Sequence, residues 1–208
     1  MKFKFYAIKT CIFLILVFLI QTLILNFTEV FILNELAKVE VWRFISSIFL
    51  HASLAHLIYN MFALALFGSI LESLVGGRRF LVVFFLTGIL ANIVSVNFYS
   101  NSLGASGAIF GVIGALIIVR PLLIVWAFGM PMPIFLAGIL WAAGDLLGAI
   151  GFLTGNPVNN TGNIAHLSGM FFGFIFGFLF RKKSSKKGSA KTSIDESEAR
   201  QWEDRHFR

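Results

Sequence analysis

The residues of this sequence best suited to chemistry are one glycine-flanked serine and three of its four histidines. The serine lies in Gly104-Ala105-Ser106-Gly107, directly before an apolar run. Flanking glycines let the backbone turn sharply and let another group approach the hydroxyl. A serine beside a neutral histidine is the minimum for nucleophilic catalysis, because the imidazole accepts the hydroxyl proton and later donates it to the leaving amine. Alone, such a serine is more often a helix N-cap. The positions of the histidines therefore decide whether Ser106 is a candidate nucleophile.

The composition places these residues in a membrane protein. Of 208 residues, 58% are hydrophobic and 13% charged, which is about half the charged fraction of soluble domains. Lipid offers no partner to a free backbone group, so each long apolar run is expected to be a helix; the alternating polarity of a membrane β-barrel is missing. The net charge of +7 reflects basic residues that flank the apolar runs. We therefore expect no nucleic-acid partner.

We predict an all-α polytopic bundle with six spans. They lie at about 10–27, 50–74, 80–98, 106–120, 134–153 and 164–180, within a membrane domain at 1–181. Residues 28–49 mix charged and apolar side chains, which is typical of interfacial helices, with Trp42 and Arg43 as interface anchors. Gly and Pro interrupt residues 122–132, which indicates an interfacial or partly re-entrant connector. Residues 182–208 form a polar, basic tail, which we expect to be solvated.

Basic residues orient this bundle. They gather near the N-terminus, at 78–79, at 120 and at 181–187, all on one side of a six-span chain. The positive-inside rule makes that side cytoplasmic, so both termini are expected in the cytoplasm. We accordingly predict a multi-pass protein of the plasma membrane, whose second, fourth and sixth spans begin at the extracytoplasmic side.

The candidate residues converge at that extracytoplasmic side. Each lies near the start of the second, fourth or sixth span: His51, His56, Asn60, Ser106 and His166. Polar groups at this depth are costly and usually face a cavity or the bundle interior. His56 and Asn60 share a helix face because they are four residues apart. The backbone N–H of Ser106 at a helix start is free to stabilise an oxyanion.

Small residues would let the fourth and sixth spans pack closely. They recur every four residues on each span: Gly107, Gly111 and Ala115 on one, and Gly169, Gly173 and Gly177 on the other. Such stripes bring membrane helices together. The packing is expected to place Ser106 within reach of His166.

Together these motifs resemble those of rhomboid intramembrane serine proteases. The matching residues are His51-x4-His56-x3-Asn60, Gly104-x-Ser106-Gly107 and Ala165-His166-x2-Gly169, within a similarity covering about 28–180. The resemblance implies a six-helix rhomboid-like fold with a Ser106–His166 dyad, no third carboxylate and no cofactor or metal. It implies an oxyanion hole from His56, Asn60 and the Ser106 backbone amide. The substrates would be transmembrane segments of other proteins in the lipid bilayer, and span five would gate their entry.

Several further residues carry supporting expectations. Trp42-Arg43 and Glu72 also resemble family features, although Glu72 is expected to serve helix packing or an ion pair. Phe110 replaces the tyrosine that stacks on the catalytic histidine in many members, so the stacking is kept and a hydroxyl is lost. His51 is expected to tie the first loop to span two. Asp145 could orient His166, but the family uses no such partner, so we expect a structural hydrogen bond.

Two other functions compete with proteolysis. A non-catalytic rhomboid-like protein would bind membrane clients, but such relatives usually lack the serine or histidine that are both present here. A metalloprotease or metal transporter would use His51, His56 and His166. Span two has no His-Glu-x-x-His motif and no carboxylate beside its histidines, so we predict no metal site. His56 and Asn60 could also be interhelical hydrogen-bonding residues alone.

Overall fold

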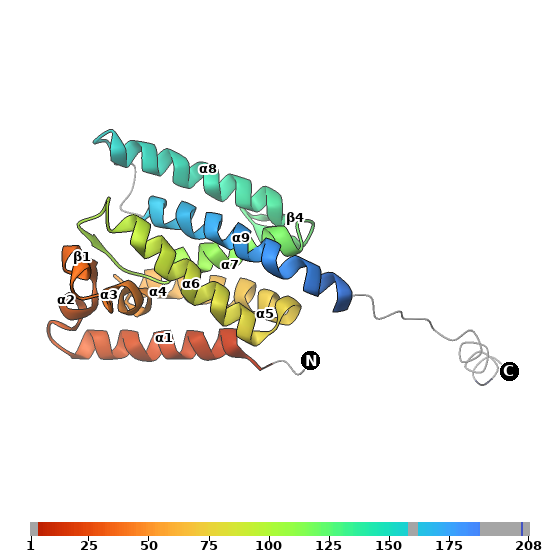
Figure 1. Ribbon diagram of the computed structural model, residues 1–208, viewed down its shortest axis with the longest axis horizontal. Helices are drawn as coiled ribbons and strands as arrows, with labels where there is room; N and C mark the ends of the chain where they lie inside the picture. Colours follow the sequence, from red (N-terminus) through yellow and green to blue (C-terminus); the bar gives the residue numbers. More distant parts are fainter. Residues whose placement is uncertain (1–3, 158–161, 188–204, 206–208) are drawn as a thin grey trace.

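The computed structural model describes residues 4–157, 162–187 and 205, and its framework is helical (Figure 1). Five helical segments are long and apolar enough to cross a membrane: α1 (Tyr6–Leu23), the continuous run Leu54–Val75, α6 (Gly77–Ser95), α8 (Ile134–Leu153) and the Asn163–Arg181 part of α9 (Asn163–Lys187). The shorter apolar helix α7 (Ser106–Val119) completes the bundle. The expected all-α class is therefore confirmed.

The helix bounds differ in detail from the predicted spans. Most ends lie within four residues of their predicted positions, but α9 continues to Lys187, into the expected polar tail. The rest of that tail, except Arg205, lies outside the described residues. The run Leu54–Val75 is made of α4 (Leu54–Ala63), the π-helical turn η3 (Leu64–Gly68) and α5 (Ser69–Val75).

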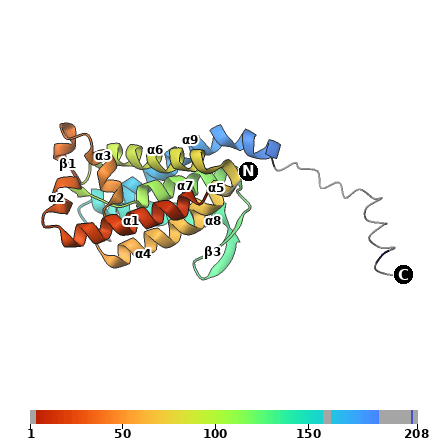
Figure 2. The same cartoon turned by 90° about the horizontal axis from the view of Figure 1, so that it is seen from below.

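Helix α7 lies at the centre of the bundle (Figures 1 and 2). Ten of its 14 residues are buried, which explains why its sequence is apolar on every face. Fourteen residues give a helix of about 21 Å, whereas the hydrocarbon core of a bilayer is about 30 Å thick. A helix of this length cannot reach both faces, and neighbouring helices enclose it instead.

The first loop folds into short elements at one end of the bundle. These are α2 (Phe27–Phe31), β1 (Leu33–Asn34), η1 (Glu35–Lys38), α3 (Arg43–Ser46) and η2 (Ser47–Phe49). Strand β1 pairs antiparallel with β2 (Asn101–Ser102). This pairing ties the loop to the segment that leads into α7.

Arg43 holds this loop together from within, so the predicted interface anchor is wrong for this residue. Its side chain is 4% exposed, pairs with Glu40 and donates to the carbonyl oxygens of Glu29 and Ile32 at 2.8 Å. The guanidinium is buried because the ends of these short elements leave carbonyls that need donors. Trp42 is 49% exposed, as an interfacial residue would be.

The connector after α7 is a β-hairpin, where the sequence predicted an interfacial or re-entrant segment. Strands β3 (Ile124–Ala127) and β4 (Met130–Pro133) pair antiparallel. Phe128 and Gly129 between them have φ values of 53° and 80°, the positive pair required by a tight two-residue hairpin turn. The prolines of β4 are tolerated because a two-stranded ribbon consists of edge strands.

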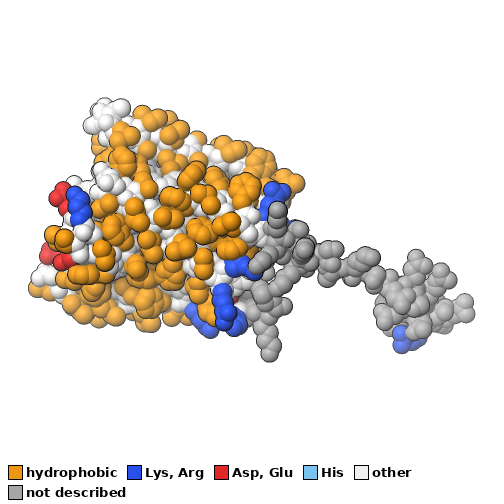
Figure 3. Space-filling view, in the orientation of Figure 1, with side chains coloured by type: hydrophobic (Ala, Val, Ile, Leu, Met, Phe, Trp, Pro, Cys, Tyr) orange, Lys and Arg blue, Asp and Glu red, His pale blue; other side chains and the backbone are white. Residues whose placement is uncertain are grey.

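The bundle is polar at its ends and apolar along its sides (Figure 3). Most of the Lys and Arg side chains on the visible face gather at the end where α9 finishes, and the acidic side chains lie at the opposite end with a basic group beside them. The basic end includes Arg78 and Arg79 at the start of α6, and Arg120 after α7. Glu72, also in this half, is buried and accepts the backbone N–H of Ala7 at 2.9 Å. This contact joins α5 to α1 and agrees with the predicted helix-packing role; no ion pair of Glu72 occurs among the described residues. These features describe a multi-pass membrane protein.

Candidate active site

The candidate residues lie at the end of the bundle opposite its basic end, where α4, α7 and α9 begin (Figure 1). Ser106 is the first residue of α7 and His166 the fourth of α9. Neither Ser106 Oγ nor His166 Nε2 forms a hydrogen bond with a described residue, so both atoms are free to meet a substrate. Catalytic hydrogen bonds are commonly long in unliganded enzymes and tighten when substrate binds.

Backbone contact between α7 and α9 brings the two helix starts together. A Cβ atom added to Gly169 would overlap the carbonyl oxygen of Gly107, and one added to Gly173 would overlap that of Gly111. Nearer the site, a Cβ on Gly107 would lie 3.5 Å from the carbonyl oxygen of Ala165. The predicted close packing of the glycine stripes is therefore confirmed. It places the residue after Ser106 against the residue before His166.

Two side chains fix the imidazole of His166. The ring of Phe110 stacks on it with centroids 4.3 Å apart and planes within 7°. Asp145 Oδ1 lies 3.0 Å from His166 Nδ1, and both residues are 8% exposed. The stacking agrees with the sequence analysis. Asp145 makes the expected hydrogen bond, but its partner is the candidate base, so a carboxylate contacts His166 where the resemblance implied no such partner.

Helix stagger explains why the sequence placed Asp145 at the wrong depth. A Cβ on Gly148 of α8 would overlap the side-chain amide of Asn163, the first residue of α9. Residues 148 and 163 are therefore level, and α8 extends past the start of α9 (Figure 1). One turn further in, Asp145 is level with His166. Depths counted from the end of each helix separately miss this offset.

His56 and Asn60 present donors on one face of α4. His56 Nδ1 accepts the backbone N–H of Ala52 at 3.4 Å, which leaves the proton of a neutral ring on Nε2. A Cβ on Gly104, two residues before Ser106, would lie 3.0 Å from that Nε2 atom. Asn60 is 6% exposed, and its side-chain nitrogen has no hydrogen-bond partner among the described residues. A buried donor without a partner is costly, as expected of a group kept free for a ligand.

Gly104 links this site to the first loop. Its backbone has φ of 124°, a conformation that side chains disfavour, and its N–H donates to the carbonyl oxygen of Ser47 at 2.9 Å. Asn92 in turn donates to Ser47 Oγ at 3.0 Å and to the Phe44 carbonyl at 2.8 Å. The loop and α6 thus hold the turn that presents Ser106.

The buried ring of His51 packs against the ring of His56. Its side chain is 1% exposed, and its ring meets that of His56 edge-on with centroids 5.2 Å apart. The side chain of Gln21 accepts the His51 N–H and donates to the His51 carbonyl, both at 3.0 Å. Sequence reasoning missed Gln21, although a polar residue inside the apolar first span is a signal in itself.

Tyr99 is a second residue that the sequence analysis missed. Its hydroxyl accepts the backbone N–H of Ile164 at 3.1 Å, and its ring lies 4.8 Å from that of Phe152. It therefore satisfies a free donor in the first turn of α9. Burial raises the pKa of the Tyr99 phenol, and the nearby Asp145 carboxylate adds to this.

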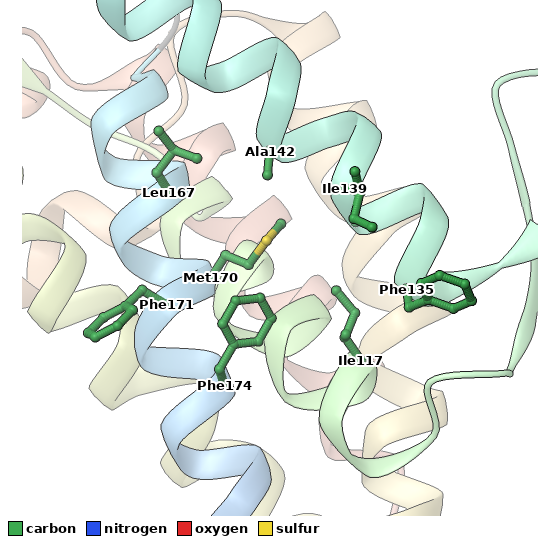
Figure 4. Close-up of a pocket in the computed structure, with 9 residues that line it drawn as sticks. Ile117, Phe135, Ile139, Ala142, Leu167, Met170, Phe171 and Phe174 are labelled. Atoms are coloured by element: carbon green, nitrogen blue, oxygen red, sulfur yellow. The ribbon is translucent and has the colours of Figure 1, made fainter.

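An apolar cleft of about 280 Å³ opens between α7, α8 and α9 (Figure 4). Ile139 and Ala142 line it from α8, Met170 and Phe174 from α9, and Ile117 from α7. Leu167, next to His166, also contributes. The cleft therefore lies directly beside the candidate site, toward the basic end. In the part of the chain that the structure describes, no group of His, Cys, Asp or Glu could hold a metal ion.

Comparison with known proteins gives one family. A rhomboid domain model matches residues 38–183. Rhomboid protease GluP of Bacillus subtilis (strain 168) is 44% identical over 85 residues, which are 40% of this chain and 17% of that protein. RHOMBOID-like protein 7 of Arabidopsis thaliana is 36% identical over 139 residues, 66% of this chain and 42% of that protein. Inactive RHOMBOID-like protein 8, also of Arabidopsis thaliana, is 38% identical over 80 residues, 38% of this chain and 23% of that protein. The chain spans less than half the length of each.

Proposed function

This chain belongs to the rhomboid family, and we propose that it is a serine endopeptidase that cleaves other membrane proteins in or near their transmembrane segments. The observation that carries the proposal is the pairing of two helix starts. Ser106 opens α7 and His166 lies in the first turn of α9, and glycines hold these helices in backbone contact beside the site. This gives a nucleophile and a base on rigid, buried elements.

In the first half-reaction, Ser106 Oγ attacks the carbonyl carbon of the scissile peptide bond. Its proton passes to His166 Nε2 as the new C–O bond forms, and the carbonyl π electrons move onto the oxygen. The backbone N–H of Ser106, His56 Nε2–H and the Asn60 amide are the donors we assign to this oxyanion. None of them must reorganise, because His56 is oriented by Ala52 and the Asn60 donor has no partner to lose.

The intermediate then collapses and the enzyme is regenerated. The C–N bond breaks, and His166 donates its Nε2 proton to the leaving amine, which leaves an ester on Ser106. Water attacks this ester with His166 again as base, and the proton returns to Ser106 Oγ when the C–O bond breaks. These reaction steps need no cofactor or metal.

The setting of the site indicates how substrates are chosen. The sides of the bundle are apolar (Figure 3), so substrates arrive from the lipid as transmembrane segments. We assign the basic end to the cytoplasm by the positive-inside rule, which puts both termini there and the site toward the extracytoplasmic half of the plasma membrane. A 14-residue α7 that ends at the basic side also leaves Ser106 below the opposite membrane surface.

Cleavage of a model substrate tests this proposal. The full chain is reconstituted in liposomes with a single-span substrate, and wild type is compared with Ser106→Ala and His166→Ala. We expect both variants to lose at least about 10³-fold in kcat. Labelling of Ser106 by a fluorophosphonate in wild type provides the second readout. Equal cleavage by all three proteins would refute the dyad. An unlabelled Ser106 together with an uncleaved but bound substrate would favour a non-catalytic client-binding protein.

A further inference from the structure

We propose that Asp145 positions His166 for catalysis, so that the site operates as a Ser106–His166–Asp145 triad. This inference deepens the proposed function and rests on it. Asp145 does not touch the reacting atoms in this scheme. It acts through the imidazole, and its contribution is to the orientation, proton placement and charge of that ring.

The contact has the distance of an ordinary N–H···O hydrogen bond and lies in a buried setting. Asp145 Oδ1 and His166 Nδ1 are 3.0 Å apart, and each side chain is 10% exposed, so water competes little for either group. A carboxylate inside a membrane bundle is costly unless it has a partner. Among the described residues no lysine or arginine pairs with Asp145, and most basic side chains on the visible face lie at the other end (Figure 3). His166 is therefore the group that compensates this carboxylate.

The hydrogen bond selects the tautomer that the reaction needs. A carboxylate can only accept, so Nδ1 of a neutral His166 must carry the ring proton. The lone pair of Nε2 is then free to take the Ser106 proton. During attack the ring becomes an imidazolium, with its Nδ1–H still on the ring, and the adjacent carboxylate stabilises that charge. Low polarity around the pair strengthens this interaction.

Phe110 cannot supply this control by itself. Stacking at 4.3 Å with planes 7° apart fixes the plane of the His166 ring, yet a half-turn flip about the Cβ–Cγ bond would keep that plane and exchange the edges of the ring. Phe110 also has no hydroxyl to bind a ring nitrogen or a water beside it. A single hydrogen bond at Nδ1 removes this remaining freedom. The two contacts are complementary, one setting the plane and the other the direction in which Nε2 points.

The competing explanation is that Asp145 merely joins α8 to α9. Hydrogen bonds between membrane helices contribute little to stability on average. Such a bond would affect stability slightly and catalysis only through the fold. Tyr99→Phe is a matched control for this explanation, because it also removes a hydrogen bond that holds the first turn of α9, at Ile164, and leaves the carboxylate–imidazole pair in place.

The kinetic test uses the full chain in liposomes with the single-span substrate. We expect Asp145→Asn to lower kcat by roughly 10²- to 10⁴-fold, because the amide can donate to Nδ1 and stabilise the wrong tautomer. KM should change little, since Asp145 does not contact substrate. Asp145→Glu keeps the carboxylate and should recover part of the lost kcat. Tyr99→Phe should stay within about tenfold of wild type, below the range expected for the tautomer change.

A spectroscopic test detects the hydrogen bond between Asp145 and His166 directly and does not require substrate cleavage. The Nδ1–H proton of His166 in a hydrogen bond to a carboxylate should give a proton NMR resonance far downfield of the amide signals. It should be present in wild type, Ser106→Ala and Tyr99→Phe, and absent in His166→Ala and Asp145→Asn. If Asp145→Asn does not fold, the resonance in wild type and Ser106→Ala decides, and its absence there overturns the inference.

The two claims fail in different ways. Ser106-dependent cleavage that survives Asp145→Asn within about threefold of the wild-type kcat would overturn the triad and leave the proposed protease standing. Failure of wild type to cleave, with Ser106 unlabelled, would overturn the proposed function and the inference with it. Equal losses of kcat in Asp145→Asn and Tyr99→Phe would assign Asp145 to helix joining, against the inference.

Discussion

Gly169→Ala would separate the two helices that carry Ser106 and His166. The added Cβ atom would overlap the carbonyl oxygen of Gly107, which belongs to backbone and cannot rotate away as a side chain can. One helix must therefore move. Because Gly107 follows Ser106 and Gly169 lies three residues after His166, the displacement occurs where the nucleophile and base meet.

The expected effect follows from the size of that displacement. Relieving the overlap requires a shift of about 1 Å, and a misplacement of this size costs about 10²-fold in rate. Overpacking in a close-packed core costs a further 1–3 kcal/mol or so in stability. We expect kcat for a model substrate to fall by about 10²-fold and the melting temperature in detergent to drop by several degrees.

Gly144→Ala is the matched control. Gly144 lies within α8, and a Cβ added there would meet nothing within 4 Å. This substitution should leave kcat unchanged and slightly favour the helix, because alanine has the higher helix propensity. Activity and melting temperature are measured on both variants in the same detergent and liposomes. Wild-type activity in Gly169→Ala would refute the argument that α7–α9 contact positions the dyad.

Three further predictions concern single groups. Asn60→Ala should lower kcat by about 10²- to 10³-fold with little change in melting temperature, because the buried amide nitrogen has no partner; a large melting shift with normal kcat would contradict this. Gly104→Ala should impair kcat more than Gly129→Ala, since both have positive φ but only the Cβ at 104 would meet a ring, 2.7 Å from His56 Cε1; equal kcat would count against it. Burial raises the pKa of Tyr99 above 10, so the folded state holds this proton longer than the unfolded chain and stability should fall as pH rises above 10. Tyrosinate absorbance should show a late titration that Tyr99→Phe abolishes, and its persistence in that variant would refute the assignment.

The sequence by itself determined the helices and the end at which they carry polar residues. Apolar run lengths predicted the five helices that are long enough to cross the membrane, although the fourth predicted span forms a 14-residue helix, α7, that is too short to reach both faces. The alternation of basic loops indicated that Ser106 and His166 share one end. Four-residue glycine spacing predicted the α7–α9 contact that the structure has. These inferences succeed because they depend on period and order along one chain, which are local properties.

Only the tertiary structure decided which residues of neighbouring helices lie in contact. Residue counting at 1.5 Å per residue gives depth along one helix, but the axial offset between two helices is set by their loops and side-chain packing. The contact of Gly148 with Asn163 sets that offset for α8 and α9, and it brings Asp145 to His166. The inward turn of Arg43 in the first loop has the same origin, since it depends on carbonyls that only the folded loop gathers.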